Sequence, residues 1–580
     1  MTMGPARHGA ACAILARRLR SAVTTAGTAT ATTTTAGTAT ATTTTAAPGL
    51  GAPGALIPQQ QAIPQFLAGQ NPARPYSSTS VLDRYADRLP GGLVWSETVA
   101  LRRAALCRSL APGSVVLVPA AKPCHVPGTG IPLPFRQEAT FFYLTGVYDD
   151  SDMIAALEVS ADGASVNYKL FVGEDDAERT RWEGERYGKK DVKTLRADCI
   201  DTLKELPAYV RGVRQQNRSV VVDAKMWRDH PFATEVLGSG EPAVSHLKQP
   251  PMGKSATFDA LEQVVHELRW RKSDVELDLM RASSEITTLG FDQCMRLSHP
   301  SMNERQISAL FEFVCKQEGA QHMPYPQVVA GGNSACTIHY SRNNRKVFDG
   351  EMVLMDAGCD FFGYASDVTR TWPVSGRFTE PQREVYERVL EAHEACLEMC
   401  REGNTLRDVH KVSVHLLSKA LSRLGIIQKS TQAVLMQGLY KPFYPHSIGH
   451  WLGMDTHDVH TISALRPFEA GTVLTIEPGL YLPRNVPDIP AQYRGIGIRL
   501  EDDVVVRENG MGPEVLSCKV PITVRDVETT VGHWMDAINT GQGSGEGGQD
   551  FAKTKRKMGN LGVYYNHPGN TIQFSSSTSE

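Results

Sequence analysis

The sequence predicts an α+β fold for the later part of the chain, residues 253–528, preceded by a smaller mixed α/β domain at 81–252. In the earlier part, short apolar runs of strand length alternate with polar turns and with a helical stretch at 96–110, a pattern typical of mixed α/β domains. In the later part, long stretches with helical periodicity alternate with strand-like runs. This predicts helices packed on a mostly antiparallel sheet.

The expected elements follow the chain in order. In the α/β domain, strands are expected at 114–120, 140–147, 153–159, 168–175 and 219–225. Prolines and polar residues at 246–258 predict a linker. In the α+β domain, helices are expected at 259–297, 383–400 and 406–425, and strands at 351–358, 367–374, 471–482 and 496–509. Residues 529–580 become rich in Gly and Ser and are expected to form a flexible tail.

The overall composition excludes several classes of protein. The 580 residues carry a formal net charge of −3 and are 41% hydrophobic, which suits a globular protein with sizeable cores. A nucleic-acid partner is not expected, because nucleic-acid-binding domains are usually basic. The 11 cysteines form no C-x-x-C pair, so reduced, buried thiols are expected rather than a zinc ribbon. No apolar run reaches the roughly 18 residues needed to span a bilayer.

The first 80 residues form a separate, low-complexity leader. No Asp, Glu or Lys precedes Asp83, and the decapeptide AGTATATTTT occurs at 26–35 and again at 36–45. An arginine-containing, acid-free and hydroxyl-rich N-terminus is typical of a mitochondrial transit peptide. The alternative is a disordered tail without a targeting function. The leader predicts a mitochondrial protein, in the matrix after presequence removal.

Four acidic residues lie within or beside apolar, strand-like runs, where a buried carboxylate is costly unless it is paired or binds a cation. They are Asp356, Asp367, Glu477 and Glu501. One of them alone would be read as an exposed edge residue, but the four together predict a metal site. Their negative charges would be balanced by two divalent ions, and an oxygen-rich ligand set favours Mn²⁺ or a similar hard ion. Two such ions activate water for attack on a carbonyl, which predicts metal-assisted hydrolysis.

A histidine-rich segment, HSIGHWLGMDTHDVH at 446–460, lies between the second and third of these acids. His446 and His450 have the spacing of one helical face, but Gly449 and Gly453 disfavour a regular helix. The segment alone leaves three interpretations open: a histidine metal cage, a catalytic acid/base cluster, or a helix that is rich in histidine by chance.

Four segments resemble, in order and spacing, the motifs of Xaa-Pro aminopeptidases (aminopeptidase P) and prolidases. They are MDAGCDFFGYASDVTRTWPV at 355–374, HSIGHWLGMDTHDVH at 446–460, TIEPGLY at 475–481 and GIGIRLEDDVVV at 495–506. Two segments further upstream, at 134–150 and 181–188, resemble the N-terminal domain of the same family. The resemblance implies a C-terminal pita-bread fold of the creatinase/aminopeptidase type, a smaller N-terminal domain, and a metallo-aminopeptidase that acts on peptide or protein N-termini.

The resemblance also implies roles for individual residues. Asp356 would bind one metal ion alone, Asp367 and Glu501 would bridge two ions, and His450 and Glu477 would complete the second ion's ligands. Glu477 would also transfer the proton from the attacking water to the leaving amine. The residues implied to position substrate and stabilise charge in the pocket are His339, His446, His457 and Arg499.

Some of these residues also have simpler interpretations. His339 could cap a turn, and Arg499 could be a surface residue of an edge strand. Asp458 could be a hydrogen-bond partner beside the site or merely a turn former. His460 matches no catalytic position of the family and is interpreted as a loop residue.

The leader makes the chain look similar to mitochondrial aminopeptidase P-like enzymes, including intermediate-cleaving peptidases that trim imported proteins. A prolidase-type dipeptidase has the same ligands and stays an alternative, and a non-catalytic pita-bread binding module is a weaker one. The sequence RPYSS at 74–78 suggests a cut before Tyr76 followed by trimming to expose Ser77. The family resemblance further suggests a homodimer or a higher homo-oligomer.

Overall fold

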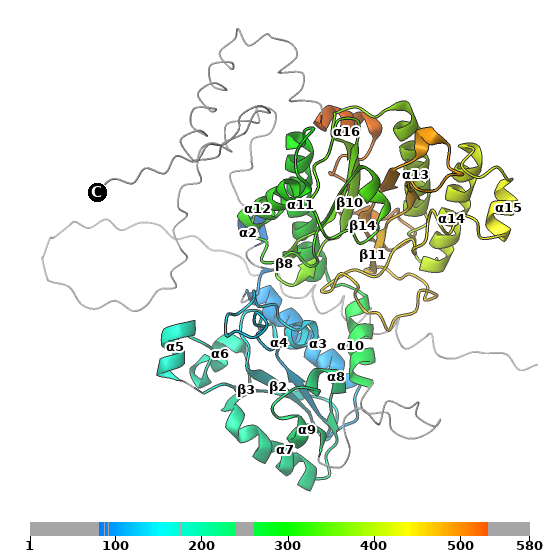
Figure 1. Ribbon diagram of the computed structural model, residues 1–580. Helices are drawn as coiled ribbons and strands as arrows, with labels where there is room; N and C mark the ends of the chain where they lie inside the picture. The colour runs from blue at the N-terminus through cyan, green and yellow to red at the C-terminus, as the bar shows by residue number, and fades with distance from the viewer. Residues whose placement is uncertain (1–80, 86–87, 91, 175, 239–259, 532–580) are drawn as a thin grey trace, which may run out of the picture. The chain divides into compact units, whose positions relative to one another are not determined.

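A computed structural model describes residues 81–85, 88–90, 92–174, 176–238 and 260–531 (Figure 1). The leader, the whole of the predicted linker at 246–258 and the tail from residue 532 lie outside the described residues. The predicted domain boundaries therefore stay predictions. None of the described helices is long and apolar enough to cross a membrane.

The earlier part of the described chain is built on a five-stranded mixed sheet in the order β4-β3-β2-β1-β5. The three central strands pair antiparallel, and the outer strands β4 and β5 pair parallel with their neighbours. The strands are β1 Val115–Pro119, β2 Met153–Val159, β3 Val166–Val172, β4 Cys199–Thr202 and β5 Val220–Val221. The helices are α2 Val81–Tyr85, α3 Leu93–Arg108, α4 Ala139–Thr145, α5 Ala177–Glu183, α6 Val192–Leu195, α7 Leu206–Gln215, α8 Ala224–Trp227 and α9 Ala233–Leu237, with short 3₁₀ turns η2 Lys189–Asp191 and η3 Leu203–Glu205. The sheet confirms the mixed α/β character expected from the sequence.

One expected strand in this part is wrong and another is mostly wrong. Residues 140–145 lie in helix α4, which begins where the Glu138 side chain accepts a hydrogen bond from the backbone N–H of Phe141 at 2.7 Å. All residues of this helix except Thr140 are buried, so periodicity could not separate helix from strand. The strand expected at 219–225 is limited to β5, because Asp223 caps α8 by accepting from the N–H of Lys225.

The later part of the described chain consists of small antiparallel sheets covered by helices. The strands are β6 Val328–Gly331, β7 Met352–Ala357, β8 Asp360–Phe361, β9 Tyr364–Ala365, β10 Val368–Pro373, β11 Val473–Ile476, β12 Gly479–Leu482, β13 Ile496–Arg499, β14 Asp502–Val505 and β15 Glu514–Val515. The helices are α10 Ala260–Trp270, α11 Asp274–Leu297, α12 Glu304–Gln317, α13 Glu380–Glu398, α14 Leu406–Arg423, α15 Thr431–Met436 and α16 Val524–Val531, with 3₁₀ turns η4 Gly332–Cys336 and η5 Ala491–Tyr493. This confirms the predicted α+β fold.

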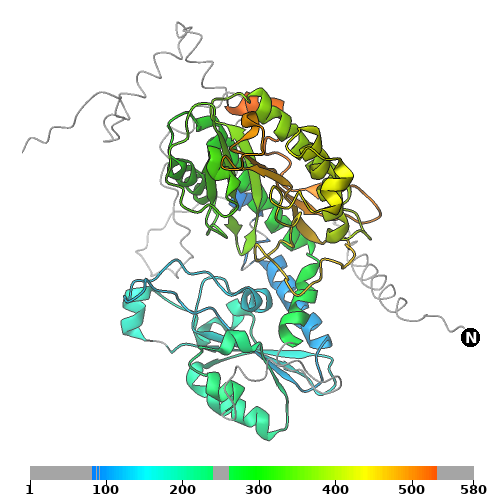
Figure 2. The ribbon, with the colours of Figure 1, turned by 45° about the vertical axis from the view of Figure 1, so that its right-hand side comes forward.

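The strands of this part lie between two helix pairs, α11 with α12 and α13 with α14 (Figures 1 and 2). Helix α11 packs on β8 and β9, α12 on β6, and α13 on β11, β12 and β13. The single helix expected at 259–297 is divided at residues 271–273, because the Ser273 side chain and Glu276 form a capping box that starts α11. The core between helices and strands includes Trp372 and Tyr386, which are fully buried.

Candidate metal centre

Strand pairing aligns three polar side chains across the sheet. Asp356 of β7 faces Thr369 of β10, and Thr369 faces Glu501 through a further antiparallel bridge. Directly opposed residues project from the same face of a sheet. The Thr369 hydroxyl donates to Glu501 Oε2 at 2.6 Å, so the register itself places the two acids on either side of one threonine.

Asp367, His450 and Glu501 each offer one ligand atom, and these atoms all lie within 4.8 Å of one another. His450 Nε2 is 3.4 Å from Asp367 Oδ2 and 3.8 Å from Glu477 Oε1. The other ring nitrogen of His450 lies 3.1 Å from the carbonyl oxygen of Trp451. A hydrogen bond from Nδ1–H to that carbonyl directs Nε2 toward the carboxylates, as in metal-binding histidines.

The backbone of the histidine-rich segment is held against β11. The N–H of Thr475 donates to the carbonyl of His450 at 2.9 Å, and the N–H of Glu477 donates to the carbonyl of Ile448 at 2.7 Å. A Cβ at Gly449 would stand 1.9 Å from the carbonyl oxygen of Thr475, so only glycine permits this approach. The segment 446–460 forms no helix, in agreement with the sequence-based expectation.

Asp356 supplies an observation that bears directly on metal binding. Its Oδ2 accepts from Arg499 Nη2 at 2.5 Å, while its Oδ1 is buried and has no hydrogen-bond partner. An unsatisfied buried acceptor costs about 1–3 kcal/mol, and more when it is charged. A divalent cation bound to Oδ1 would remove this cost, so the residues present fit a metal ion.

The carboxylates of the cluster hold protons unusually strongly when no metal is bound. Burial, with the charges of nearby acids, raises the pKa of Glu477 to about 7, raises that of Asp356, and places that of Glu501 well above its ordinary range. Burial opposes charge on His450 too, but its hydrogen bond and ion pair with Asp367 outweigh this and raise the pKa to about 9. Such a cluster binds cations in exchange for protons.

His446 and Arg499 meet at a tyrosine that the sequence analysis did not single out. His446 Nε2 lies 2.8 Å from Tyr481 Oη, which also accepts from Arg499 Nη1 at 3.0 Å. Burial, followed by the charge of Arg499, lowers the pKa of His446 to about 4, so this ring is neutral at pH 7. Arg499 is fully buried, which excludes the alternative of a surface edge residue.

His457 and His339 are exposed at the border of this cluster. The His457 ring lies edge-on to His450, with centroids 4.4 Å apart. Burial is the largest cause of the lowered pKa of His446 and of His457, and the charge of His339 makes a smaller contribution to both. The structure therefore brings all of the predicted pocket histidines near the acidic cluster.

Asp458 and His460, the other two polar residues of the histidine-rich segment considered from the sequence, pair with residues outside the acidic cluster. Asp458 is buried and forms ion pairs with Arg269 and with Lys272, the latter at 3.0 Å. It is thus a buried counter-ion rather than a mere turn former. His460 Nε2 lies 3.2 Å from Glu262 Oε1 and belongs to a group of side chains that shares no residue with the cluster.

Three neighbours of the ligand atoms escaped the sequence analysis. Tyr325 Oη donates to Asp367 Oδ1 at 2.5 Å, and the Asp503 carboxylate accepts from the backbone N–H of Asp367 at 3.1 and 3.2 Å. Thr369 was detectable, since it stands two residues after Asp367 and so shares its face of the strand. Tyr325 lies outside the strands and carries no pattern of this kind.

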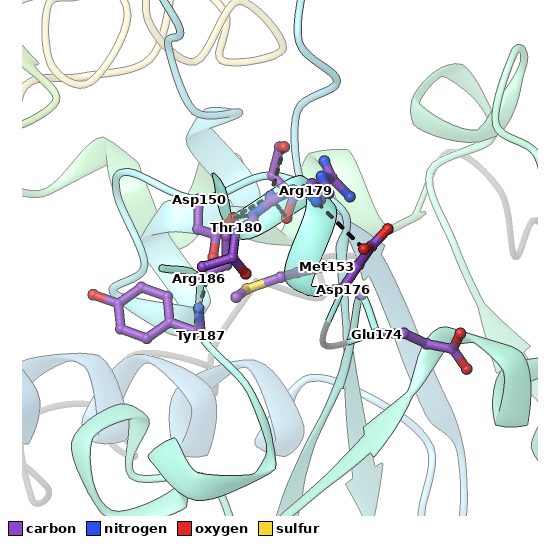
Figure 3. Close-up of a pocket in the computed structure, with 10 residues that line it drawn as sticks. Asp150, Met153, Glu174, Asp176, Arg179, Thr180, Arg186 and Tyr187 are labelled. Carbon is purple, nitrogen blue, oxygen red and sulfur yellow. Dashed lines mark hydrogen bonds and ion pairs between the residues drawn. The ribbon is translucent and has the colours of Figure 1, made fainter. Parts of the chain in front are cut away.

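A hollow in the earlier part of the chain differs in its charges from the acidic cluster (Figure 3). Its arginines are already paired: Arg186 with Asp150, and Arg179 with Asp152 at 2.5 Å. These matched ion pairs stabilise the loop around the hollow, whereas the cluster at Asp356 has carboxylates in excess. The cluster is therefore the candidate metal centre, and the hollow is not.

Comparison with known proteins agrees with this geometry. The profile of metallopeptidase family M24 matches residues 278–508, and that of the aminopeptidase P N-terminal domain matches residues 99–222. The chain is 36% identical over 411 residues to Xaa-Pro aminopeptidase 3 of Rattus norvegicus, covering 70% of this chain and 79% of the relative. It is 34% identical over 429 residues to the mitochondrial intermediate cleaving peptidase 55 of Arabidopsis thaliana, covering 74% and 81%. Among solved structures, zinc-substituted E. coli aminopeptidase P in complex with product is similar with a TM-score of 0.67 and 31% identity, covering 75% of this chain and 98% of that one.

Proposed function

Because the chain belongs to the aminopeptidase P branch of metallopeptidase family M24, and is thus a metal-dependent aminopeptidase, we propose that it removes the N-terminal residue from peptides or imported proteins with two divalent ions. The observation that carries the proposal is the convergence of Asp367, His450 and Glu501 within 4.8 Å, next to the unpartnered Oδ1 of Asp356. An excess of buried carboxylates around one imidazole suits a hydrolytic metal centre.

We assign the ligands as follows. Asp356, Asp367, His450, Glu477 and Glu501 would hold the two ions between them. The ligand set has one nitrogen donor and is otherwise oxygen, which favours Mn²⁺. Bound ions of this kind supply Lewis acidity and lower the pKa of coordinated water.

Glu477 is the group that moves the proton. A carboxylate within reach of the reacting groups can act first as a general base and then as a general acid. The two oxygens of Glu477 lie toward His450 Nε2, at 3.8 Å, and toward His446 Nδ1, at 3.6 Å. Glu477 can therefore accept a proton from the attacking water and donate it to the leaving amine.

The remaining pocket residues position substrate. The exposed His457 and His339 offer ring nitrogens toward a bound peptide and toward charge developing on its scissile carbonyl, while neutral His446 acts through Tyr481, which its Nε2 contacts at 2.8 Å. Arg499 uses its donors on Asp356, Tyr481 and Thr369, so its part is to orient those groups rather than to bind the substrate directly.

The substrate class is drawn from the relatives and from the leader. Relatives of the Xaa-Pro aminopeptidase kind and of the intermediate-cleaving kind support either Xaa-Pro cleavage or trimming of proteins after presequence removal. The acid-free leader supports a place in the mitochondrial matrix. The mature N-terminus, read by mass spectrometry, tests this: a start at Tyr76 or Ser77 supports it, and an intact Met1 contradicts it.

The activity is tested with the mature chain loaded with Mn²⁺ and offered Xaa-Pro-Yaa tripeptides, Xaa-Pro dipeptides and peptides that begin Tyr-Ser. We expect release of the first residue from the longer peptides, and loss of this activity in Glu477→Gln. The matched control is Glu469→Gln, which removes the charge of a glutamate paired with Arg271 on the surface. Cleavage of dipeptides alone would favour a prolidase-type dipeptidase, and no cleavage with metal bound would overturn the proposal.

A further inference from the structure

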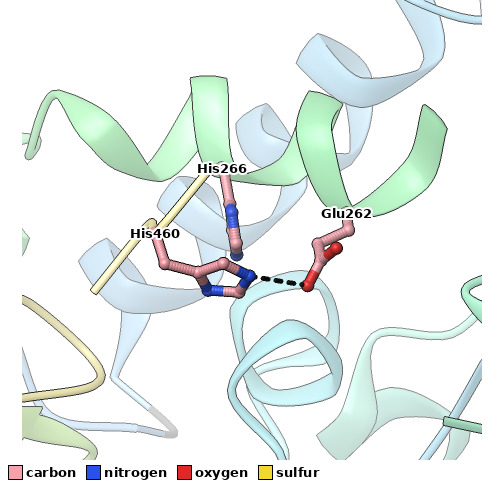
Figure 4. A group of neighbouring side chains, drawn as sticks. All are labelled: Glu262, His266 and His460. Carbon is pink, nitrogen blue, oxygen red and sulfur yellow. Dashed lines mark ion pairs between the residues drawn. The ribbon is translucent and has the colours of Figure 1, made fainter. Parts of the chain in front are cut away.

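A second group of possible metal ligands lies outside the acidic cluster and shares no residue with it. Glu262 and His266 are four residues apart in α10, on one face of the helix, and His460 approaches them from the end of the histidine-rich segment (Figure 4). The ligand atoms of the three residues all lie within 4.8 Å of one another. The aminopeptidase mechanism makes no use of them.

The geometry is close to that of a metal site. His460 Nε2 is 3.2 Å from Glu262 Oε1, and the two imidazole rings have centroids 4.9 Å apart. Ligand atoms on a tetrahedral Zn²⁺ stand about 3.4 Å apart, from bond lengths of about 2.0–2.1 Å. A shift of about 1 Å closes the remaining gap, and the mostly exposed side chain of His460 is free of the packing that would oppose it.

His266 is the fixed member of the group. Its side chain is buried, and its Nδ1 lies 2.8 Å from the Thr461 hydroxyl. A hydrogen bond from Nδ1–H to that oxygen leaves the lone pair of Nε2 available to a metal ion, which is how metal-binding histidines are usually oriented. Burial, followed by the charge of Arg269, keeps the ring neutral by lowering its pKa to about 4.

One cation competes for the same carboxylate. Lys225 of α8 lies 2.9 and 2.7 Å from the two oxygens of Glu262. Its side chain is 54% exposed, so the ammonium group can turn to solvent when a divalent ion arrives. An ion pair with one exposed partner is weak compared with transition-metal ligation.

We propose that Glu262, His266 and His460 bind one Zn²⁺ or a similar transition ion, apart from the catalytic centre. Two imidazoles and one carboxylate, with a water in the fourth position, form a typical Zn²⁺ donor set, whereas the catalytic cluster is dominated by oxygen. The ion fastens the far end of segment 446–460 to α10. The near end of that segment carries His450, so the third ion steadies the backbone that presents a catalytic ligand.

The test counts metal ions on the full-length chain after its catalytic centre has been loaded with Mn²⁺. Wild type, His460→Ala and His415→Ala are equilibrated with the same excess of Zn²⁺, desalted, and analysed for both metals. His415 is an exposed histidine of α14 outside both groups of ligands, which makes its variant the matched control. We expect wild type and His415→Ala to hold one ion per chain more than His460→Ala.

Activity is assayed before Zn²⁺ is added, and equal activity of the three proteins shows that the catalytic ions are in place. The activity assay therefore tests the aminopeptidase proposal, and the ion count tests the third site separately. Equal ion counts in wild type and His460→Ala would overturn the third site. So would a crystal soaked in Zn²⁺ whose anomalous map shows no peak between these residues.

A second variant tests the competition at Glu262. Lys225→Met removes the ammonium group, so we expect half-saturation of the third site at a several-fold lower Zn²⁺ concentration. An unchanged or weaker affinity would show that Glu262 does not hold the ion and would overturn the three-residue site.

Discussion

Two adjacent carboxylates, Glu501 and Asp502, are equally buried and behave in opposite ways. Glu501 faces Asp356, Asp367 and Glu477, and burial together with these acids holds its pKa well above the ordinary range. Asp502 is buried too, but the Arg370 guanidinium at 2.7 Å outweighs the cost of burial and holds its pKa far below the ordinary range. Neighbouring residues of one chain segment thus serve different purposes.

The difference teaches how to separate structural from functional acids. The charge of Asp502 is matched by Arg370 and by the hydroxyl of Ser517, so the protein itself completes the interaction. The charge of Glu501 is left for a cation that the protein does not supply. Burial alone identifies neither case, because the sign of the pKa change depends on the partners.

The largest effect is expected from Glu501→Gln. Loss of a bridging carboxylate should lower the metal content and reduce kcat/KM by at least about a thousandfold, equivalent to about 4 kcal/mol of transition-state stabilisation. The metal-free protein should be at least as stable as wild type, since the substitution relieves repulsion among buried acids. Elemental analysis, peptidase assays and urea unfolding of the metal-free protein check these points. A large loss of metal-free stability would show that Glu501 is a structural residue like Asp502.

Asp502→Asn should do the reverse. Removing one partner of a buried ion pair leaves Arg370 uncompensated and costs about 3–5 kcal/mol of folding free energy. The fraction that stays folded should still bind metal, because Asp502 is turned toward Arg370 rather than toward the cluster. Urea unfolding measures the loss, and Glu501→Gln serves as its adjacent control. Unchanged stability would break the contrast between the two acids.

Asp458 extends the contrast to pH. Its ion pairs with Arg269 and Lys272 outweigh burial and lower its pKa to about 2 from 3.8, which corresponds to about 2.5 kcal/mol of stability at neutral pH. A lowered acid pKa stabilises the fold above the unfolded-state pKa, so this contribution is complete above about pH 5 and is lost as the pH falls from 4 toward 2. The unfolding free energies of wild type and Asp458→Asn should therefore converge across that window. A difference that does not change with pH would contradict the assignment.

These contrasts mark the limit of what the sequence could predict. Carboxylates in apolar runs were enough to predict a metal site at Asp356, Asp367, Glu477 and Glu501, and the family resemblance then added His450 as a ligand. Helical and strand periodicity predicted the α+β fold around it. The stretch RLEDD could not separate Glu501 from Asp502 and Asp503, because the partner that decides is more than a hundred residues away in the chain. Helix α4 was missed for a different reason: nearly all of its residues are buried, so it has no polar face to reveal its period.

The smallest effect is expected where a neutral group supports a ligand. Tyr325→Phe removes the hydroxyl that donates to Asp367 Oδ1 but keeps the ring, so the fold should be preserved. Loss of a hydrogen bond that orients a ligand usually lowers metal affinity by about 10–100-fold, and we expect the lower end, about 1.4 kcal/mol, because Asp367 keeps its backbone hydrogen bond to Asp503. Competition with a coloured chelator measures the affinity. The control is Tyr493→Phe, which removes a tyrosine hydrogen bond to Glu384 away from the cluster and should leave metal binding unchanged; equal affinities in the two variants would mean that Asp367 is oriented by its backbone alone.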